Sequence, residues 1–276
     1  MEYPLVSVVV TTKNEEKNIE NCLKSIKEQS YPNIEIIVVD NDSGDRTKEL
    51  ALKYTDKVYD KGPERSAQRN FGMIEKSSGE YVMFVDADMA LSSDLIKDCV
   101  EFIEKERCAA LHISEIVMGS GFWSRVRRFE RSFYDGTVID GARFFRKDIF
   151  VKVGGFDETM SGPEDWDIDK KIKAIGKIGL VPRAGKRAVI YHNEAEFDLK
   201  RYLNKKGYYA RSFEAYISKW GVDDPDIKKQ FRPIYRYFGV FVENGKWIKL
   251  LLHPILSFGM YCLRGMVGVV YLLNRK

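Results

Sequence analysis

The feature that most limits the possible folds is a β-branched apolar run at residues 5–12, Leu-Val-Ser-Val-Val-Val-Thr-Thr. A run without regular polar alternation predicts a strand that is buried on both faces, which is typical of the centre of a parallel sheet. Similar runs follow at 34–39, Ile-Glu-Ile-Ile-Val-Val, and at 81–85, Tyr-Val-Met-Phe-Val. The N-terminal part of the chain therefore predicts a sheet with several buried strands.

The segments between these runs have the spacing of helices. Residues 15–29 carry one apolar stripe, and Asn14 is a candidate cap for a helix there. Further helices are expected at 46–54 and 64–77, and a short strand at 58–59. This alternation of strand and helix predicts a doubly wound α/β sheet within about the first 110 residues.

Length and composition exclude several classes of protein. The chain has 276 residues, which fits one large α/β domain or one domain with an appendage. Apolar residues make up 44% and charged residues 31%, which excludes wholesale disorder and a membrane protein with many spans. The net charge of +4 is too small to indicate nucleic-acid binding. The four cysteines are scattered, and no signal peptide precedes the first strand, so we expect a reducing, cytoplasmic location.

The second half of the chain has a different pattern. Strands are expected at 111–118, at 137–146 and at 187–191, the last ending at His192. Residues 154–169 are rich in glycine and predict loops. From about residue 197 onward the pattern is helical and aromatic, so we expect a helical C-terminal region.

Polar residues follow all three buried runs, at 11–15, 40–45 and 86–88. Because ligands bind beyond the carboxyl ends of the strands in open α/β sheets, these segments are expected to line one crevice. Helix capping is an alternative explanation for Asp42 and its neighbours. It does not explain Asp86 and Asp88, because carboxylates at the end of an apolar strand need a cation or donors to offset their burial. Mg²⁺ or Mn²⁺, as hard cations, would suit these oxygens.

Six short motifs occur in order along the chain, whereas the glycine-rich loops of P-loop and dinucleotide-binding proteins are missing from the sequence. The motifs are Val8-Val9-Val10-Thr11-Thr12-Lys13-Asn14-Glu15, then Ile37-Val38-Val39-Asp40-Asn41-Asp42-Ser43-Gly44-Asp45-Arg46-Thr47, then Arg69-Asn70-Phe71-Gly72 with Gly79-Glu80-Tyr81, then Phe84-Val85-Asp86-Ala87-Asp88, then Gly154-Gly155-Phe156-Asp157-Glu158, then Glu164-Asp165-Trp166-Asp167. Together they resemble the GT-A glycosyltransferases of family 2, over about residues 5–195. The resemblance implies a GT-A fold with a nucleotide-sugar half at 1–110, an acceptor and catalytic half at 111–196, and a helical region at 197–276.

The resemblance also implies a nucleotide site and a metal site. Asp40 is expected to hydrogen-bond the nucleotide base or ribose. Arg65 or Arg69 is expected to neutralise phosphate charge, the alternative being that both are solvated helix cations. The rest of the nucleotide site is expected to consist of Thr11, Asn14, Glu15, Asp42 and Asp86.

Asp86-Ala87-Asp88 resembles the DxD element of the family. Asp88 is expected to bind Mg²⁺ or Mn²⁺ directly, and Asp86 to contact the ribose or to reach the metal through water. Some GT-A enzymes have a histidine as a further ligand, and His192 is the candidate here. The alternative for His192 is an ordinary hydrogen-bonded histidine.

Asp165 matches the position of the general base in the family. In inverting transfer the acceptor hydroxyl attacks the anomeric carbon in line and must lose its proton to a base. Glu164 is a candidate for binding acceptor hydroxyls, and Trp166 for contact with a sugar face. The alternatives are an acidic helix N-terminus for Glu164 and Asp165, and core packing for Trp166.

Residues 247–273 are the most apolar stretch of the chain. The stretch is long enough to span a bilayer, but Pro254 and Arg264 are expected to break it into two pieces. We therefore expect two short helices in the membrane interface at the inner face of the cell membrane. The cations expected at the anionic surface are Lys246, Lys249, Arg275 and Lys276. A buried helical hairpin is the alternative.

The predicted function is inverting transfer of a sugar from a nucleotide-sugar donor to a hydroxyl of a saccharide or lipid-linked acceptor. A polyprenyl-phosphate sugar synthase is an alternative, although its ionised phosphate acceptor needs no base such as Asp165. A non-catalytic sugar- or membrane-binding module is a second alternative. Met89 after the second aspartate disfavours a phosphatase with a strand-end D-x-D, and the lack of glycine at 11–15 disfavours a nucleotidyltransferase.

Overall fold

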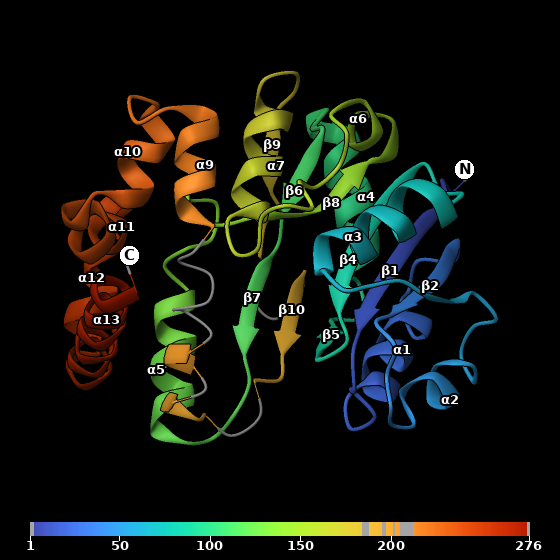
Figure 1. The fold of residues 1–276 in the computed structure, drawn as a ribbon, viewed down its shortest axis with the longest axis horizontal. Coiled ribbons are helices and arrows are strands. Elements are labelled where there is room, and N and C mark those ends of the chain that lie inside the picture. The colour runs from blue at the N-terminus through green and yellow to red at the C-terminus, as the bar shows by residue number, and fades with distance from the viewer. Residues whose placement is uncertain (1–2, 184–187, 195–196, 201, 205–211, 275–276) are drawn as a thin grey trace.

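The computed structural model describes residues 3–183, 188–194, 197–200, 202–204 and 212–274 (Figure 1). A seven-stranded sheet with the order β3-β2-β1-β4-β8-β6-β9 forms its centre. Strands β1 to β4 run parallel, whereas β8 is antiparallel to both β4 and β6. The strands of this sheet are β1 (Val6–Thr12), β2 (Ile34–Asp40), β3 (Val58–Asp60), β4 (Tyr81–Asp86), β6 (Ala110–His112), β8 (Ala142–Arg146) and β9 (Ile178–Leu180).

Helices cover both faces of the sheet, and β1 supplies core residues to both. Val8 and Val10 join the cluster formed with α1, α2 and α4, whereas Val9 joins the cluster formed with η1, α6 and α7. Successive side chains of a strand point to opposite faces, so a strand between two helical layers must be apolar at every position. The predicted α/β fold class is therefore confirmed.

The helices over this sheet are α1 (Ile19–Lys27), α2 (Thr47–Ala51), α3 (Arg65–Asn70), η1 (Phe71–Lys76), α4 (Leu95–Glu106), α6 (Lys147–Lys152) and α7 (Glu164–Lys173). The expected cap at Asn14 is wrong, because α1 begins at Ile19 after Asn18. Asn14 instead has a positive φ of 53° in the loop after β1. The helix expected at 64–77 continues from α3 into the π-helical turn η1.

The strand expected at 111–118 is two strands that belong to different sheets. β6 ends at His112 in the large sheet, and β7 (Ser114–Val117) begins a second sheet with the order β5-β10-β7. The other strands of the second sheet are β5 (Met89–Leu91) and β10 (Val189–His192). The strand expected at 137–146 is also shorter than predicted, because β8 starts only at Ala142. The second sheet matters because it pairs His192 with Met89, the residue after Asp88.

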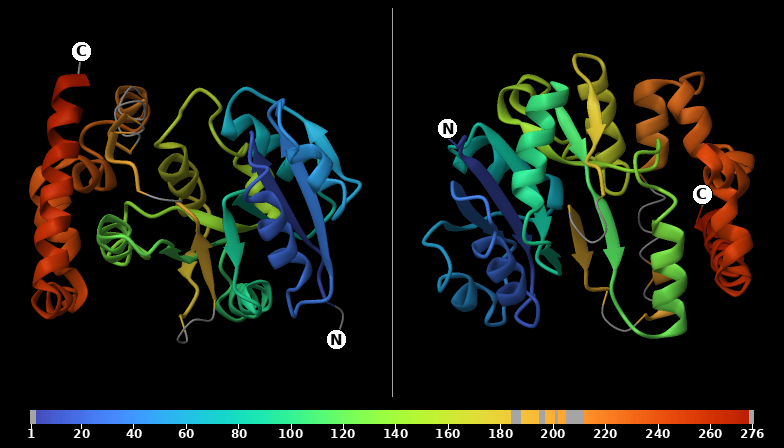
Figure 2. Two further views of the ribbon diagram at one scale, coloured as in Figure 1. Left: turned by 90° about the horizontal axis from the view of Figure 1, so that it is seen from below. Right: turned by 180° about the vertical axis from the view of Figure 1, so that it is seen from behind.

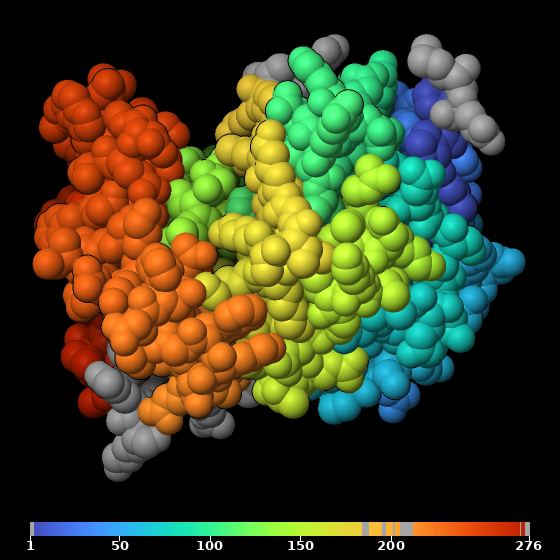
Figure 3. Space-filling model, turned by 90° about the horizontal axis from the view of Figure 1, so that it is seen from above, coloured from blue at the N-terminus to red at the C-terminus, as the bar shows by residue number. Residues whose placement is uncertain are grey.

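The remaining helices form one side of the molecule, away from the N-terminal strands (Figures 2 and 3). They are α5 (Phe122–Arg131), α9 (Phe213–Trp220), α10 (Pro225–Phe231), η2 (Tyr235–Gly239), α11 (Val240–Val242), η3 (Glu243–Gly245), α12 (Trp247–Leu252) and α13 (Pro254–Asn274). α13 packs on α5, where a Cβ added to Gly259 would lie only 2.8 Å from Val126.

The break expected at Pro254 is confirmed, but the break expected at Arg264 is wrong. α13 runs through Arg264 without interruption. The guanidinium of Arg264 turns into the protein, where Nη1 lies 2.8 Å from the Glu130 carboxylate on α5. None of the helices in the described residues combines the length and the apolar character that crossing a bilayer requires.

Candidate active site

The three predicted polar strand ends lie at one edge of the large sheet. β1 holds them in register, because Thr12 lies beside Asp40 of β2 and Thr11 lies beside Asp86 of β4. The Thr11 hydroxyl donates to Asp86 Oδ1 at 3.1 Å, which ties β1 to β4 through their side chains.

Two loops meet where the nucleotide is expected. Asp40 is fully buried and accepts hydrogen bonds from the backbone N–H and the hydroxyl of Ser43, at 2.7 and 2.6 Å. Asn14 joins this loop by accepting from the backbone N–H of Gly44 at 2.9 Å. Asn14 and Asp42 both have positive φ angles, 53° and 49°. Such strained residues concentrate at binding sites, because the surrounding structure must enforce them.

Glu15 and Asp42 lie at the same edge with different exposure. The Glu15 backbone N–H donates to Thr47 Oγ1 at 2.8 Å, and its carboxylate accepts from Asn18 at 2.7 Å. Asp42 is exposed to solvent. The nucleotide roles of these residues and of Thr11, Asn14 and Asp40 stay predictions.

Arg69 is the central cation of the site. It is 1% exposed, so the alternative of a solvated helix cation is wrong for this residue. Its Nη2 lies 3.2 Å from Asp86 Oδ1, and its Nη1 lies 3.1 Å from Asp165 Oδ1. One guanidinium therefore joins the end of β4 to the start of α7.

The carboxylate of Asp86 stays ionised despite its burial. Burial opposes ionisation, but the charges of Arg69 and Arg143 outweigh it and hold the pKa of Asp86 well below its usual range. Arg143 Nη1 approaches Asp86 Oδ2 at 3.9 Å from β8. Asp86 thus lies between two arginines, one on each side.

The two acidic residues that begin α7 differ in exposure. The side chain of Glu164 is 3% exposed and faces Arg65 and Arg69, at 3.4 and 3.8 Å. Burial and the neighbouring charge of Asp165 raise the pKa of Glu164, in opposition to the two arginines. The Asp165 side chain is 32% exposed, so of the pair it is the one that a solvent-borne group can reach.

Trp166 lies in an aromatic cluster next to this pair. Its ring stacks on Phe213 with a centroid distance of 5.8 Å and meets Phe231 edge-on at 6.0 Å. It is only partly buried, so both core packing and contact with a sugar face stay open for it.

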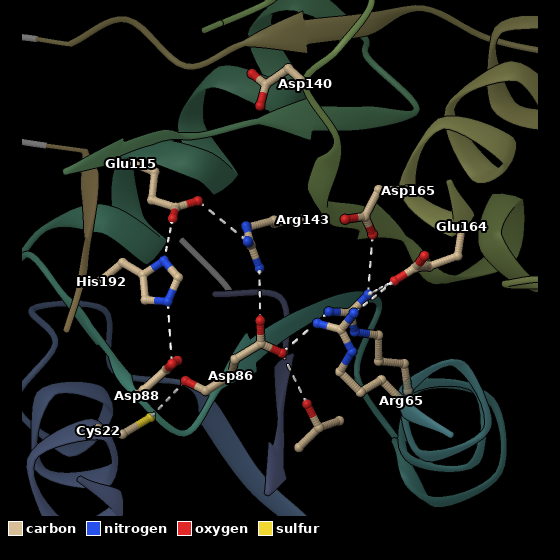
Figure 4. A network of polar contacts seen from close by, with 12 residues as sticks. Cys22, Arg65, Asp86, Asp88, Glu115, Asp140, Arg143, Glu164, Asp165 and His192 are labelled. Atoms are coloured by element: carbon tan, nitrogen blue, oxygen red, sulfur yellow. Dashed lines mark hydrogen bonds and ion pairs between the residues drawn. The ribbon is translucent and has the colours of Figure 1, made fainter. Parts of the chain in front are cut away.

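His192 lies between two carboxylates on the other side of Asp86 (Figure 4). Its Nδ1 is 2.6 Å from Glu115 Oε1 and its Nε2 is 3.2 Å from Asp88 Oδ2. Burial lowers the pKa of His192, but the hydrogen bonds with Asp88 and Glu115 raise it to about 10 overall. β5 and β10 bring these residues together through antiparallel pairing of Met89 with His192.

Asp88 and His192 have the chemistry of a metal site. Asp88 Oδ1 is buried and has no hydrogen-bond partner among the described residues. Coordination of a cation would satisfy this oxygen. A carboxylate with an imidazole suits Mn²⁺ once His192 Nε2 gives up its proton, and Glu115 on Nδ1 would orient the ring. Asp86 fits less well, because its oxygens face Thr11 and the two arginines. Within the described residues, no three His, Cys, Asp or Glu side chains are grouped to hold a metal ion.

Sequence reasoning missed Glu115 and Arg143. Glu115 is buried and faces Arg131, Arg143 and His192. Each is a charged residue within a short apolar strand, a pattern that indicates a buried ion pair. The sequence does not show which partner each one finds.

α7 is also anchored beyond Arg69. Lys219 of α9 lies 2.7 Å from Asp157 and 2.8 Å from Asp167 of α7. Asp167 is fully buried. The indole of Trp220 donates to the same Asp167 at 2.8 Å. The motif that contains Asp157 is therefore bound to the C-terminal helices through one lysine.

These observations agree with comparison to known proteins. The family model of glycosyl transferase family 2 matches residues 7–156, more than half of the chain. The chain belongs to this family. The match includes the ends of β1, β2 and β4, the Arg69 motif and the start of the Asp157 motif, but not Asp165 or His192.

The chain is similar in sequence to curated glycosyltransferases and similar in fold to solved ones. It is 27% identical over 201 residues to a beta-monoglucosyldiacylglycerol synthase of Nostoc sp., over 60% of this chain and 43% of the relative. The matched parts span less than half the length of the curated relatives. The mannosyltransferase PcManGT of Pyrobaculum calidifontis, solved with GDP-Man and Mn²⁺, has a TM-score of 0.67 and 20% identity over all of this chain and 89% of its own. Residues 1–349 of TarS of S. aureus, solved with UDP-GlcNAc, have a TM-score of 0.58 and 21% identity over 97% of this chain and 89% of that one.

The Lys219 anchor predicts a pH-dependent loss of stability. Burial raises the pKa of Asp157, but hydrogen bonds from Lys219 and Thr159 outweigh it and lower the pKa to about 2. Because this value lies below that of the unfolded chain, the stabilisation is complete above about pH 4 and is lost as the pH falls toward 2. Lys219→Met should therefore cost about 2 kcal/mol at pH 7 and less at pH 3.

Urea unfolding at the two pH values measures this difference. Lys228→Met is the matched control, because Lys228 pairs with the exposed Asp223 and should change stability little at either pH. An equal loss for Lys219→Met at both pH values would contradict the assignment of the effect to Asp157.

Proposed function

We propose that this protein is an inverting glycosyltransferase that moves a sugar from a nucleotide-sugar donor to a hydroxyl of a saccharide or lipid-linked acceptor. One observation carries the proposal: a single buried guanidinium, Arg69, lies 3.2 Å from Asp86 and 3.1 Å from Asp165. A strand-end carboxylate and a partly exposed carboxylate on a helix are thereby held on two sides of one cation. Family membership and the nucleotide-sugar complexes of PcManGT and TarS support a nucleotide-sugar donor.

Asp165 acts as the general base in this proposal. An acceptor hydroxyl is a weak nucleophile, and its attack on the anomeric carbon needs a base that accepts its proton. The proton passes to Asp165, the oxygen forms the new glycosidic bond, and the bond to the nucleoside diphosphate breaks. Phosphate acceptors are already ionised, so a carboxylate in this position favours a hydroxyl acceptor over a polyprenyl phosphate.

The donor lies at the edge formed by β1, β2 and β4. Asp40 binds the base or ribose, with Thr11, Asn14, Glu15 and Asp42 around it, and Asp86 contacts the ribose. Arg65 and Arg69 are close enough to this edge to offset the charge of the diphosphate. Preorganised cations stabilise a leaving group without reorganisation at the moment of reaction.

Asp88 and His192 hold a divalent cation, Mg²⁺ or Mn²⁺, in this proposal. The unpartnered Asp88 Oδ1 supports this role, as does the Mn²⁺ in the PcManGT complex. When bound, such an ion supplies charge stabilisation to a departing diphosphate. On the acceptor side, Trp166 offers a ring face, and Glu164 keeps its predicted role in hydroxyl binding only if it is released from Arg65.

The C-terminal helices are proposed to rest on an anionic membrane surface. Along α13 the exposed apolar residues recur at helical spacing, at Ile255, Phe258, Val269 and Leu272, with exposures of 57–74%. Arg264 points the other way, toward Glu130, so it does not interrupt this stripe. Residues 246–276 contain no Asp or Glu, which suits an anionic bilayer. Lys246 and Lys249 instead donate to backbone carbonyls of Phe133 and Ser132, so apolar contact carries most of the binding. The other two expected cations, Arg275 and Lys276, lie outside the described residues.

The role of Asp165 predicts a kinetic split. Asp165→Asn removes the base but not the donor-binding residues, so turnover should fall by roughly 10²–10⁴ while donor affinity stays nearly constant. Steady-state kinetics and calorimetry with the nucleotide sugar measure the two quantities. A variant that loses donor binding and keeps its turnover at saturation would place Asp165 in the nucleotide site. Unchanged transfer to a phosphate acceptor would favour the polyprenyl-phosphate synthase.

The role of Asp88 predicts a loss of metal-dependent donor binding. Asp88→Asn should abolish transfer and the Mn²⁺-dependent part of nucleotide affinity, because one anionic ligand is lost, and the circular dichroism spectrum should not change. Asp148→Asn, at a carboxylate 74% exposed on α6, is the control. Full activity of the wild-type protein in excess chelator would contradict the metal role.

The membrane proposal predicts that two exposed residues control liposome binding. The double variant Ile255→Asn and Phe258→Asn should bind anionic liposomes much more weakly and still hydrolyse the donor. Transfer to a lipid-linked acceptor should fall more than transfer to a soluble one. Val151→Asn, at an apolar residue 44% exposed on α6, is the control. If the wild-type protein ignores liposomes and is a dimer that this double variant dissociates, the stripe binds a second copy of the chain.

A further inference from the structure

His112 is a buried histidine that lies outside the candidate site described above. It ends β6, and it is 4% exposed. The pairing of β6 with β8 changes register between Leu111 and His112, an irregularity of the β-bulge type. Bulges re-aim side chains and are frequent next to active sites. Here the histidine faces α7, the helix that begins with Glu164 and Asp165.

The imidazole of His112 contacts two buried carboxylates. Its Nε2 lies 2.6 Å from Asp169 Oδ2 on α7, and its Nδ1 lies 3.7 Å from Asp140 Oδ2 in the loop before β8. Asp169 also accepts the backbone N–H of Ala142 at 3.0 Å. Asp140 is held in turn by Arg131 at 2.8 Å. His112 therefore contacts the helix and one end of the segment 140–142 directly, and it reaches the other end, Ala142, through Asp169.

The middle of that segment touches the proposed base. A Cβ added to Gly141 would lie 2.7 Å from Cβ and 3.3 Å from Cγ of Asp165. The side chain of Asp165 therefore packs directly against the backbone of Gly141. Asp165 also lies one helical turn before Asp169, so the contact of Asp169 with His112 sets the rotation and the height of the turn that carries the base.

We infer that His112 is a positioning residue that fixes the Asp165 carboxylate, through Asp169 on α7 and through the segment 140–142. The inference rests on the proposed role of Asp165 as the base. Enzymes place reacting groups within a fraction of an ångström, and a displacement of about 1 Å costs up to roughly 10² in rate. His112 is not itself a catalytic residue, because it is buried behind the helix.

The charges around His112 support this arrangement. Burial lowers the pKa of His112, but the charge and hydrogen bond of Asp169 and the charge of Asp140 outweigh it and raise the pKa overall. Lys173, from the end of α7, acts in the opposite direction. Arg131 from α5 neutralises Asp140 from its far side. A protonated imidazole can face one carboxylate with each ring nitrogen, because both nitrogens then carry a proton.

The test compares His112→Leu, which removes donors and charge, with His112→Gln, which keeps an N–H for Asp169. Ile172→Val is the matched control, because Ile172 is a fully buried residue of α7 with no polar role. Each change is made in the natural chain and in Asp165→Asn. The turnover number, the dissociation constant of the nucleotide sugar and the melting temperature are measured for all of them.

His112→Leu should lower the turnover number about 10- to 100-fold and leave donor affinity nearly unchanged. His112→Gln should recover most of the turnover, and Ile172→Val should lower only the melting temperature. In Asp165→Asn, His112→Leu should cause no further loss, because the group that it positions is already inactive. If His112→Leu does not fold, Asp169→Asn tests the same contact, since it keeps an oxygen for Ala142 and loses the charge.

Two results would overturn the inference. One is a turnover of His112→Leu equal to that of Ile172→Val. The other is a further loss of the full size in Asp165→Asn, which would mean that His112 acts independently of the base. If Asp165→Asn alone keeps normal turnover, the proposed function loses its base, and that failure is visible without any change at His112.

Discussion

The arrangement of the site depends on one buried cation, the guanidinium of Arg69. It contacts Asp86 at the end of β4 and Glu164 and Asp165 at the start of α7, and it rests 3.9 Å from the ring centre of Phe84. The guanidinium of Arg69 and the carboxylate of Glu164 are almost fully buried, and burying either charge costs several kcal/mol unless its partners are present. Each of these two groups is therefore stable only because the other is there. The contacts of Arg69 thus join the edge of the sheet to the helix that carries the proposed base.

A second set of charges holds the opposite side of Asp86. Arg143 lies between Asp86 and Glu115, and Glu115 bonds His192, which faces Asp88. Burial opposes the ionisation of Glu115, but Arg131 and the hydrogen bond of His192 hold its pKa well below its usual range. The site is thus built from alternating fixed charges before any ligand binds. Such preorganisation is the main way in which proteins stabilise charge that develops during a reaction.

The sequence predicted the elements whose own residues show how they are buried. β1, β2 and β4 were predicted from their apolar runs, Asp86 and Asp88 from the polar residues that end β4, and Asp165 from its match to the position of the general base in the family. The division of 111–118 at Ile113 could not be predicted, because it depends on which sheet each half joins. Glu115 and Arg143 were missed for the same reason, since their partners lie far away in the sequence. His112 gave no periodic pattern at all, and only the fold brings it to Asp169.

Arg264 shows how a correct physical rule led to a wrong prediction. A charge in an apolar stretch is costly in lipid, so the residue was expected to break the helix. In the fold the cost is removed by Glu130 and Tyr134, which meet the guanidinium on the side of α13 that faces α5. A helix of a globular domain normally turns its apolar side inward and its charge outward. α13 places its charged residue inward and leaves Ile255 and Phe258 outward. Close packing at Gly259 and the Arg264 ion pair fix this orientation, and the apolar residues that it leaves exposed are the ones proposed to contact a membrane.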